Sequence, residues 1–137
     1  MRVVADTNII ISMLLWGKSL ERLLVLVNQN KIKLCFSVHT IDELFRVIHY
    51  PKIQRQVLKA DFPIERFIDR LLAVSLICYP EEIKKSPLRD VSDNRILEVA
   101  VEVKASAIIS GDKHLLDIEK FRNIPIYSPA EFIKFYD

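Results

Sequence analysis

The sequence contains little glycine and little cysteine, and its charges almost cancel. Only two of its 137 residues are glycine, Gly17 and Gly111, so it cannot form a glycine-rich nucleotide-binding loop. Its two cysteines, Cys35 and Cys78, form no Cys-x-x-Cys pair, which argues against a zinc ribbon or a disulfide scaffold. Twenty Lys and Arg against eighteen Asp and Glu leave a net charge of +2. That balance excludes a polybasic protein that holds nucleic acid by bulk charge alone.

Long apolar runs are also missing. No run approaches the ~20 residues that a helix needs to cross a bilayer. Asp6 interrupts the apolar N-terminal segment before it reaches the length of a signal peptide. We therefore expect a cytoplasmic protein with reduced cysteines and no membrane partner. A composition of 50% hydrophobic and 28% charged residues predicts one globular domain over residues 1–137.

Strand and helix patterns alternate along the chain. Short β-branched or alternating segments predict strands at 2–5, 31–36, 74–79, 107–109 and 124–127. Apolar residues three or four apart predict helices at 8–15, 20–28, 40–49, 52–60, 64–73, 93–104 and 129–135, with a short helix after residue 112. Residues 80–91 read as a surface loop. This order predicts an α/β protein, a three-layer α/β/α sandwich with a central, mostly parallel sheet.

Acidic residues fall beside the predicted strand ends. Asp6 directly follows the first predicted strand, and Asp112 follows the fourth after Ser110 and Gly111. Glu43 and Asp93 lie near the starts of predicted helices. The carboxyl ends of parallel strands share one edge of a sheet, where neighbouring strands lie ~4.8 Å apart. Ligands of open α/β sheets bind at that edge, where the strand order reverses. We therefore expect the four acids to meet in one pocket.

Clustered carboxylates repel one another and stay ionised together only when a cation neutralises them. Ligands that are all oxygen favour a hard ion, Mg²⁺ or Mn²⁺. Such an ion activates water for attack on a phosphodiester, and a second ion can stabilise the leaving oxygen. The pattern therefore predicts a metal-dependent phosphodiesterase.

Each acid also has a purely structural interpretation. Asp6 and Asp112 could cap the helices that follow them. Glu43 could complete a capping box with Thr40, and Asp93 could complement a helix dipole behind a Ser92 cap. Capping alone does not explain why the acids gather at strand ends.

Four segments of the chain resemble, in order, the motifs of PIN-domain ribonucleases. They are 3–8 (VVADTN), 37–44 (SVHTIDEL), 90–100 (DVSDNRILEVA) and 107–116 (AIISGDKHLL). The similarity covers essentially the whole chain and is greatest to the single-domain toxins of type II toxin–antitoxin systems. It implies a compact α/β/α fold, Mg²⁺ or Mn²⁺, and endonucleolytic cleavage of single-stranded RNA. A toxin also implies a cognate antitoxin protein.

The resemblance assigns roles position by position. The acidic quartet that holds metal and catalyses the reaction would be Asp6, Glu43, Asp93 and Asp112. Auxiliary roles would fall to the small polar residues Asn8 and Ser110 and to an additional acid, Asp90. Two positions depart from the pattern. Asn94 replaces a frequent Asp, which could weaken a second metal position, and Ser110 replaces the commoner Thr but keeps a hydroxyl.

Residues 44–60 contain four basic residues and no acid: Arg46, Lys52, Arg55 and Lys59. The last three recur at helical spacing and would share a face. They form either a solvated face opposite Ile53 and Val57 or a grip on the RNA backbone. Tyr50 could stack on a base.

The main alternative is a non-catalytic RNA- or protein-binding module on a degenerate nuclease fold. A phosphorylatable receiver is disfavoured, because the third predicted strand runs into Tyr79 and Pro80 without an Asp. The intact quartet favours the enzyme. The apolar helices at 8–15 and 20–28 exceed what one small core needs, which predicts that they serve a homodimer or the antitoxin.

Overall fold

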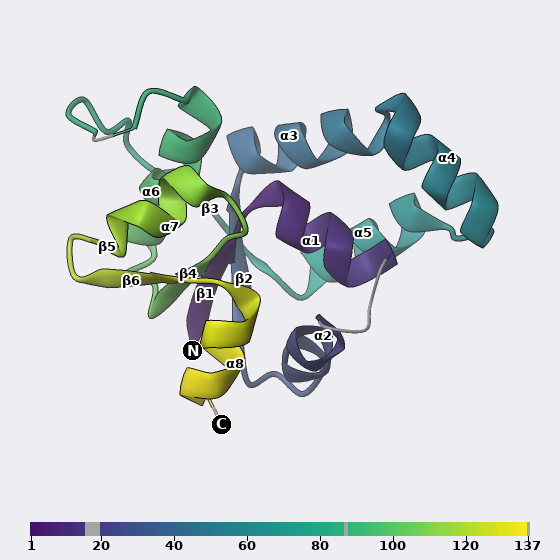
Figure 1. Ribbon diagram of the computed structural model, residues 1–137, viewed down its shortest axis with the longest axis horizontal. Helices are drawn as coiled ribbons and strands as arrows, with labels where there is room; N and C mark the ends of the chain where they lie inside the picture. Colours follow the sequence, from purple (N-terminus) through teal and green to yellow (C-terminus); the bar gives the residue numbers. More distant parts are fainter. Residues whose placement is uncertain (16–19, 87, 137) are drawn as a thin grey trace.

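The computed structural model describes residues 1–15, 20–86 and 88–136. Within these residues the strands form one six-stranded sheet in the order β3-β2-β1-β4-β6-β5 (Figure 1). The strands are β1 (Arg2–Ala5), β2 (Lys33–Ser37), β3 (Leu76–Cys78), β4 (Ala107–Ile109), β5 (Lys120–Phe121) and β6 (Ile124–Tyr127). All pairs are parallel except β5 with β6, so the predicted mostly parallel sheet is confirmed.

Helices cover both faces of this sheet (Figure 1). They are α1 (Thr7–Leu15), α2 (Glu21–Asn28), α3 (Val38–Ile48), α4 (Pro51–Ala60), α5 (Ile64–Ala73), α6 (Val91–Glu102), α7 (Lys113–Ile118) and α8 (Pro129–Tyr136). Among the described residues, no helix is long and apolar enough to span a bilayer.

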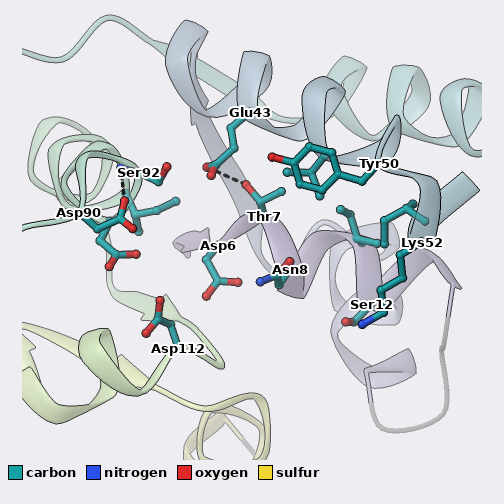
Figure 2. Close-up of a pocket in the computed structure, with 15 residues that line it drawn as sticks. Asp6, Thr7, Asn8, Ser12, Glu43, Tyr50, Lys52, Asp90, Ser92 and Asp112 are labelled. Carbon is teal, nitrogen blue, oxygen red and sulfur yellow. Dashed lines mark hydrogen bonds between the residues drawn. The ribbon is translucent and has the colours of Figure 1, made fainter.

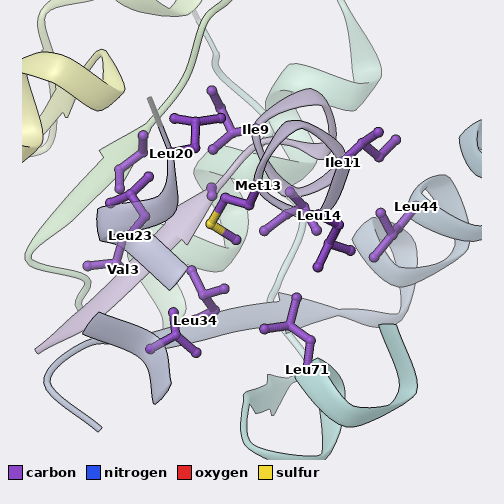
Figure 3. Packing of buried hydrophobic residues seen from close by; sticks show 14 of the residues in the cluster. Val3, Ile9, Ile11, Met13, Leu14, Leu20, Leu23, Leu34, Leu44 and Leu71 are labelled. Carbon is purple, nitrogen blue, oxygen red and sulfur yellow. The ribbon is translucent and has the colours of Figure 1, made fainter. Parts of the chain in front are cut away.

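Alternate side chains of each central strand enter two separate cores. Val3 and Ala5 of β1 pack against α1 and α2, whereas Val4 of the same strand packs against α6. This alternation follows from the period-two geometry of a strand, and it makes both faces of the sheet apolar. The first core contains the side chains of α1 and α2 together with Leu34 of β2 (Figure 3). The three-layer α/β/α sandwich is therefore confirmed.

The strand order reverses beside β1. The chain builds outward from β1 through β2 to β3, and then returns to place β4 on the other side of β1. The carboxyl ends of β1 and β4 therefore face the crevice where connections leave in opposite directions, the usual ligand position in such sheets.

Two helices begin two residues earlier than the periodicity predicts, because residues upstream cap them. Ser37 accepts a hydrogen bond from the Thr40 backbone N–H at 3.2 Å, and Thr40 Oγ1 accepts from the Ser37 N–H at 2.9 Å. This reciprocal capping box starts α3 at Val38 rather than at residue 40. Asp90 Oδ1 accepts from the Ser92 N–H at 2.8 Å and starts α6 at Val91 rather than at residue 93.

The predicted second strand, 31–36, lies at 33–37, and the third is shorter than predicted, at 76–78. Strand β5 is not predicted from the sequence. This strand has only two residues and turns into β6 through Arg122 and Asn123, which have φ of 46° and 67°. A tight hairpin turn with positive φ normally contains glycine. This turn has none, so the sequence gives no glycine signal for a hairpin here. Both cysteines are free, as expected.

Candidate active site

All four predicted acids line one pocket of about 580 Å³ at the carboxyl ends of β1 and β4 (Figure 2). The polar and charged residues that line it are Asp6, Thr7, Asn8, Ser12, Glu43, Tyr50, Lys52, Asp90, Ser92, Asp93 and Asp112. The auxiliary residues Asn8 and Asp90 are therefore in the pocket. Ser110 lies directly behind it, fully buried, with its hydroxyl bonded to Asp6.

Asp6 uses its two carboxylate oxygens for two purposes. Oδ1 accepts a hydrogen bond from the Ile9 N–H at 2.9 Å and caps α1, as the structural interpretation predicted. Oδ2 accepts from the Ser110 hydroxyl and from the Gly111 N–H at 3.3 Å. Burial raises the pKa of Asp6, and the nearby charge of Asp112 raises it further. Capping a helix and lining the pocket are thus compatible for this residue.

Ser110 connects two of the acids. Its hydroxyl donates to Asp6 and accepts from the Asp112 backbone N–H at 2.9 Å. Asp112 Oδ1 in turn accepts from the His114 N–H at 2.8 Å and caps α7, so its capping interpretation also holds. The turn after β4 therefore fixes Asp112 relative to Asp6 across the neighbouring strand.

The capping interpretation of Glu43 is wrong. Because α3 begins at Val38, Glu43 lies in the second turn and faces the pocket. Its Oε2 accepts a hydrogen bond from Thr7 Oγ1 at 3.0 Å (Figure 2), and its Oε1 lies 4.0 Å from Arg46 Nη2. Thr7 is not among the site residues predicted from the sequence. The only available signal was its position, directly after Asp6 in the first motif.

Asp93 is the most strongly perturbed acid of the pocket. Its side chain is buried in the first turn of α6, behind an Asp90 cap rather than the expected Ser92 cap. Burial and the charges of Asp112, Asp90 and Asp6 raise its pKa to about 6, and His114 opposes the shift. The carboxylates of this pocket therefore repel one another.

Asn94, the departure from the family pattern, does not line the pocket. Its Oδ1 is bonded to the Ser86 hydroxyl, and its Nδ2 donates to the Leu88 carbonyl at 3.2 Å. A carboxylate could not make the second bond. The amide therefore holds the segment before α6, rather than leaving a gap among the acids.

The basic residues separate into three groups. Lys52 lines the acidic pocket, and Arg46 lines a smaller adjoining pocket of about 250 Å³ that shares Glu43 and Ser92 with it. Arg55 and Lys59 are exposed on α4 and line neither pocket. On the opposite side of α4, Ile53 is buried in the core, as the solvated-face interpretation predicts.

The donor set of the pocket suits a hard cation, because every acidic ligand candidate offers oxygen. Across the residues that the structure describes, no three His, Cys, Asp or Glu side chains are arranged as a ready-made ion cage. Mg²⁺ usually keeps several of its waters and takes only one or two carboxylates directly. Burial and neighbouring carboxylates raise the pKa values of Asp6 and Asp93, and a bound cation would relieve that repulsion. The residues present therefore fit a partly hydrated ion.

A family model for the PIN domain matches residues 2–114 of the chain. A crystal structure of VapBC2 from Rickettsia felis, bound to a DNA fragment from its own promoter, contains a chain of similar fold. The identity is 14%, the TM-score is 0.58, and the match covers 92% of this chain and 97% of that one. No curated protein matches the sequence. Because the family model spans most of the chain and all four acids, the chain belongs to the PIN domain family.

Proposed function

We propose that this chain is a Mg²⁺- or Mn²⁺-dependent endoribonuclease that cleaves single-stranded RNA. The observation that carries the proposal is the meeting of Asp6, Glu43, Asp93 and Asp112 in one open pocket at the strand-order reversal. Nothing in their sequence positions requires such a meeting if they serve only as caps. Membership of the PIN domain family supports the same chemistry.

The four acids would hold the ion, directly or through its waters, with Asp90 and Asn8 beside them. When bound, the ion would supply an activated water and positive charge for a phosphodiester. Ser110 orients Asp6, and Thr7 orients Glu43, through the hydrogen bonds described above. Side chains held in this way cannot turn away from the pocket, which keeps the ligand set together at little entropic cost.

Incubation with unstructured RNA and Mn²⁺ tests the proposal. Cleavage should appear with Mn²⁺, disappear with chelator, and be lost in Asp6→Asn. Asp117→Asn is a matched control, because Asp117 is an exposed acid on α7 outside the pocket. Cleavage that survives both the chelator and Asp6→Asn would falsify the metal mechanism. RNA binding without cleavage under all conditions would instead favour the non-catalytic binding module.

We further infer that the chain acts in the cytoplasm as the toxin of a toxin–antitoxin pair. The fold shared with a chain of a VapBC2 structure supports this inference. Induced expression should then stop bacterial growth, Asp6→Asn should relieve the arrest, and co-expression of the adjacent reading frame should do the same. Growth that is unaffected by the unmodified chain would contradict the toxin role.

A homodimer is expected if the apolar residues of the first two helices exceed what the chain's own core can bury. Their side chains Ile10, Met13, Leu23 and Leu26 are buried within the chain's own core. Self-association is therefore a separate proposal, which light scattering on the purified chain would test.

A further inference from the structure

The pocket has a second end that the acids do not occupy. From the carboxylates it continues between α1 and α3 to the first turn of α4 (Figure 2). Six residues line this end: Ile11, Ser12, Val47, Tyr50, Lys52 and Ile53. Its composition is apolar, aromatic and basic, the opposite of the acidic end.

Helix geometry explains how the two ends are connected. Asn8 and Ser12 lie one turn apart on α1, and Glu43 and Val47 lie one turn apart on α3. All four line the pocket, so each helix extends the lining by about 6 Å from the acids towards α4. The pocket is therefore elongated along a fixed direction, as an extended chain would require.

The chemistry of the α4 end matches a nucleotide. Tyr50 is the residue just before α4, and it is 48% exposed. Val47 and Ile53 line the same pocket. Such an aromatic surface can stack on any base, because every base has a flat π-face. Lys52 is the only basic residue lining this pocket in the described part of the chain, and no described residue forms an ion pair with it. Its charge is available for a phosphate.

The adjoining smaller pocket offers a different exit from the acids, but its charges are already compensated. Arg46 lies 4.0 Å from Glu43, and Arg95 Nη1 lies 3.1 Å from the buried Glu98. That pocket also has no Tyr, Phe or Trp in its described lining. Among the described lining residues of the two pockets, an unpaired cation beside a Tyr, Phe or Trp ring occurs only at the α4 end.

On the basis of the proposed nuclease function, we propose that the α4 end of the pocket is a nucleotide subsite. Tyr50 stacks on an unpaired base next to the phosphate held at the acids, and Lys52 contacts the phosphate beside that base. Stacking and a phosphate contact do not depend on the identity of the base, so the subsite adds affinity with little preference for sequence. It requires the base to be unpaired, because a base inside a duplex has no free face.

Fluorescence anisotropy with labelled, unstructured RNA oligonucleotides tests the subsite. The full chain is titrated in Ca²⁺, and the oligonucleotide is checked afterwards on a gel for cleavage. Tyr50→Ala should weaken binding about fivefold to 150-fold, and Tyr50→Phe should bind as the unmodified chain does. Tyr79→Ala is the matched control, since Tyr79 is 79% exposed and lies outside the pocket. Equal losses in Tyr50→Phe and Tyr50→Ala would overturn stacking.

The phosphate contact has its own readout. Lys52→Ala should reduce the slope of log affinity against log salt by about 0.7, the value for one phosphate contact with a single strand. Lys59→Ala, on the same helix but outside the pocket, should leave the slope unchanged. Unchanged affinity and slope in Lys52→Ala, or a larger effect in Arg46→Ala, would overturn the proposed path of the strand.

This test separates the subsite from the nuclease proposal. If the chain cleaves RNA with Mn²⁺ but Tyr50 and Lys52 variants bind normally, the subsite is wrong and the nuclease stands. If the binding losses appear but no ion supports cleavage, the nuclease is wrong and the subsite stands.

Discussion

Thr7 Oγ1 donates a hydrogen bond of 3.0 Å to Oε2 of Glu43, a residue 36 positions away (Figure 2). Thr7 begins α1 and is almost fully buried, so its hydroxyl has little freedom to turn elsewhere. The bond holds Glu43 toward the pocket, although Arg46 competes for its other oxygen. The residue beside Asp6 thus orients an acid on a different helix.

Removal of this hydroxyl should impair metal use more than folding. We expect Thr7→Val to lower the RNA cleavage rate about tenfold, because hydrogen bonds to charged groups contribute about 1.5–3 kcal/mol. The Mn²⁺ concentration for half-maximal cleavage should rise, and Thr7→Ser should restore both values. A Val variant with the same Mn²⁺ requirement as the unmodified chain would show that Thr7 does not position Glu43.

Ser110 should matter for stability as well as activity. Ser110→Ala removes the donor to Asp6 and the acceptor for the Asp112 N–H in a fully buried place. Unsatisfied buried groups cost about 1–3 kcal/mol each, so urea denaturation should show a loss of at least that size. Ser110→Thr keeps the hydroxyl and should retain more cleavage activity than Ser110→Ala. Equal activity in the two variants would contradict the role of this hydroxyl.

The stability of the metal-free protein should depend on pH through Asp93. Its pKa is raised from 3.8 to about 6 by burial and neighbouring carboxylates, so the folded chain binds this proton more tightly than the unfolded chain does. The stabilising contribution is complete below about pH 4 and is lost as the pH rises through about 6. Asp93→Asn should therefore raise the melting temperature in chelator at about pH 7.5, and raise it less at about pH 4.5.

Added Mn²⁺ should reverse this order at about pH 7.5, because only the unmodified chain keeps all four acids to stabilise the ion. Melting curves at both pH values, with chelator and with Mn²⁺, check the prediction. A variant that is less stable than the unmodified chain in chelator at the higher pH would contradict the proposed charge repulsion.

Replacement of Asn94 by the Asp that is frequent at this family position should not improve metal binding. Asn94→Asp loses the bond from Nδ2 to the Leu88 carbonyl, and thermal unfolding should report a cost of about 1 kcal/mol. Its Mn²⁺ affinity should equal that of the unmodified chain, because residue 94 does not line the pocket. Asn28→Asp, at an exposed position in α2, controls for the added charge. Tighter Mn²⁺ binding in Asn94→Asp alone would place this residue at the site after all.

The layers and the meeting of the acids could be predicted from the sequence, because both follow from local patterns. Strand periodicity places Asp6 and Asp112 at strand ends, and parallel pairing then brings those ends to one edge. Capping was harder to predict, since Ser37 and Thr40 are both good caps and only the packing of α3 decides between them. The bond from Thr7 to Glu43 connects distant segments, so no local pattern reveals it.

The basic residues show the same limit. Spacing placed Lys52, Arg55 and Lys59 on one face of a helix, but the angle at which α4 meets α3 decides which of them reaches the pocket. Only Lys52, in the first turn, does so. The residues that share one face of a helix can be predicted from a sequence. The angle at which that helix packs against another cannot.

Mn²⁺ binding measured by titration calorimetry is the most direct test of a shared ion site at the four acids. The unmodified chain should bind Mn²⁺, and Asp6→Asn, Glu43→Gln, Asp93→Asn and Asp112→Asn should each weaken that binding by at least about tenfold. Asp117→Asn should bind as the unmodified chain does. Unchanged affinity in the four pocket variants would contradict the account, since the acids would then serve the fold alone.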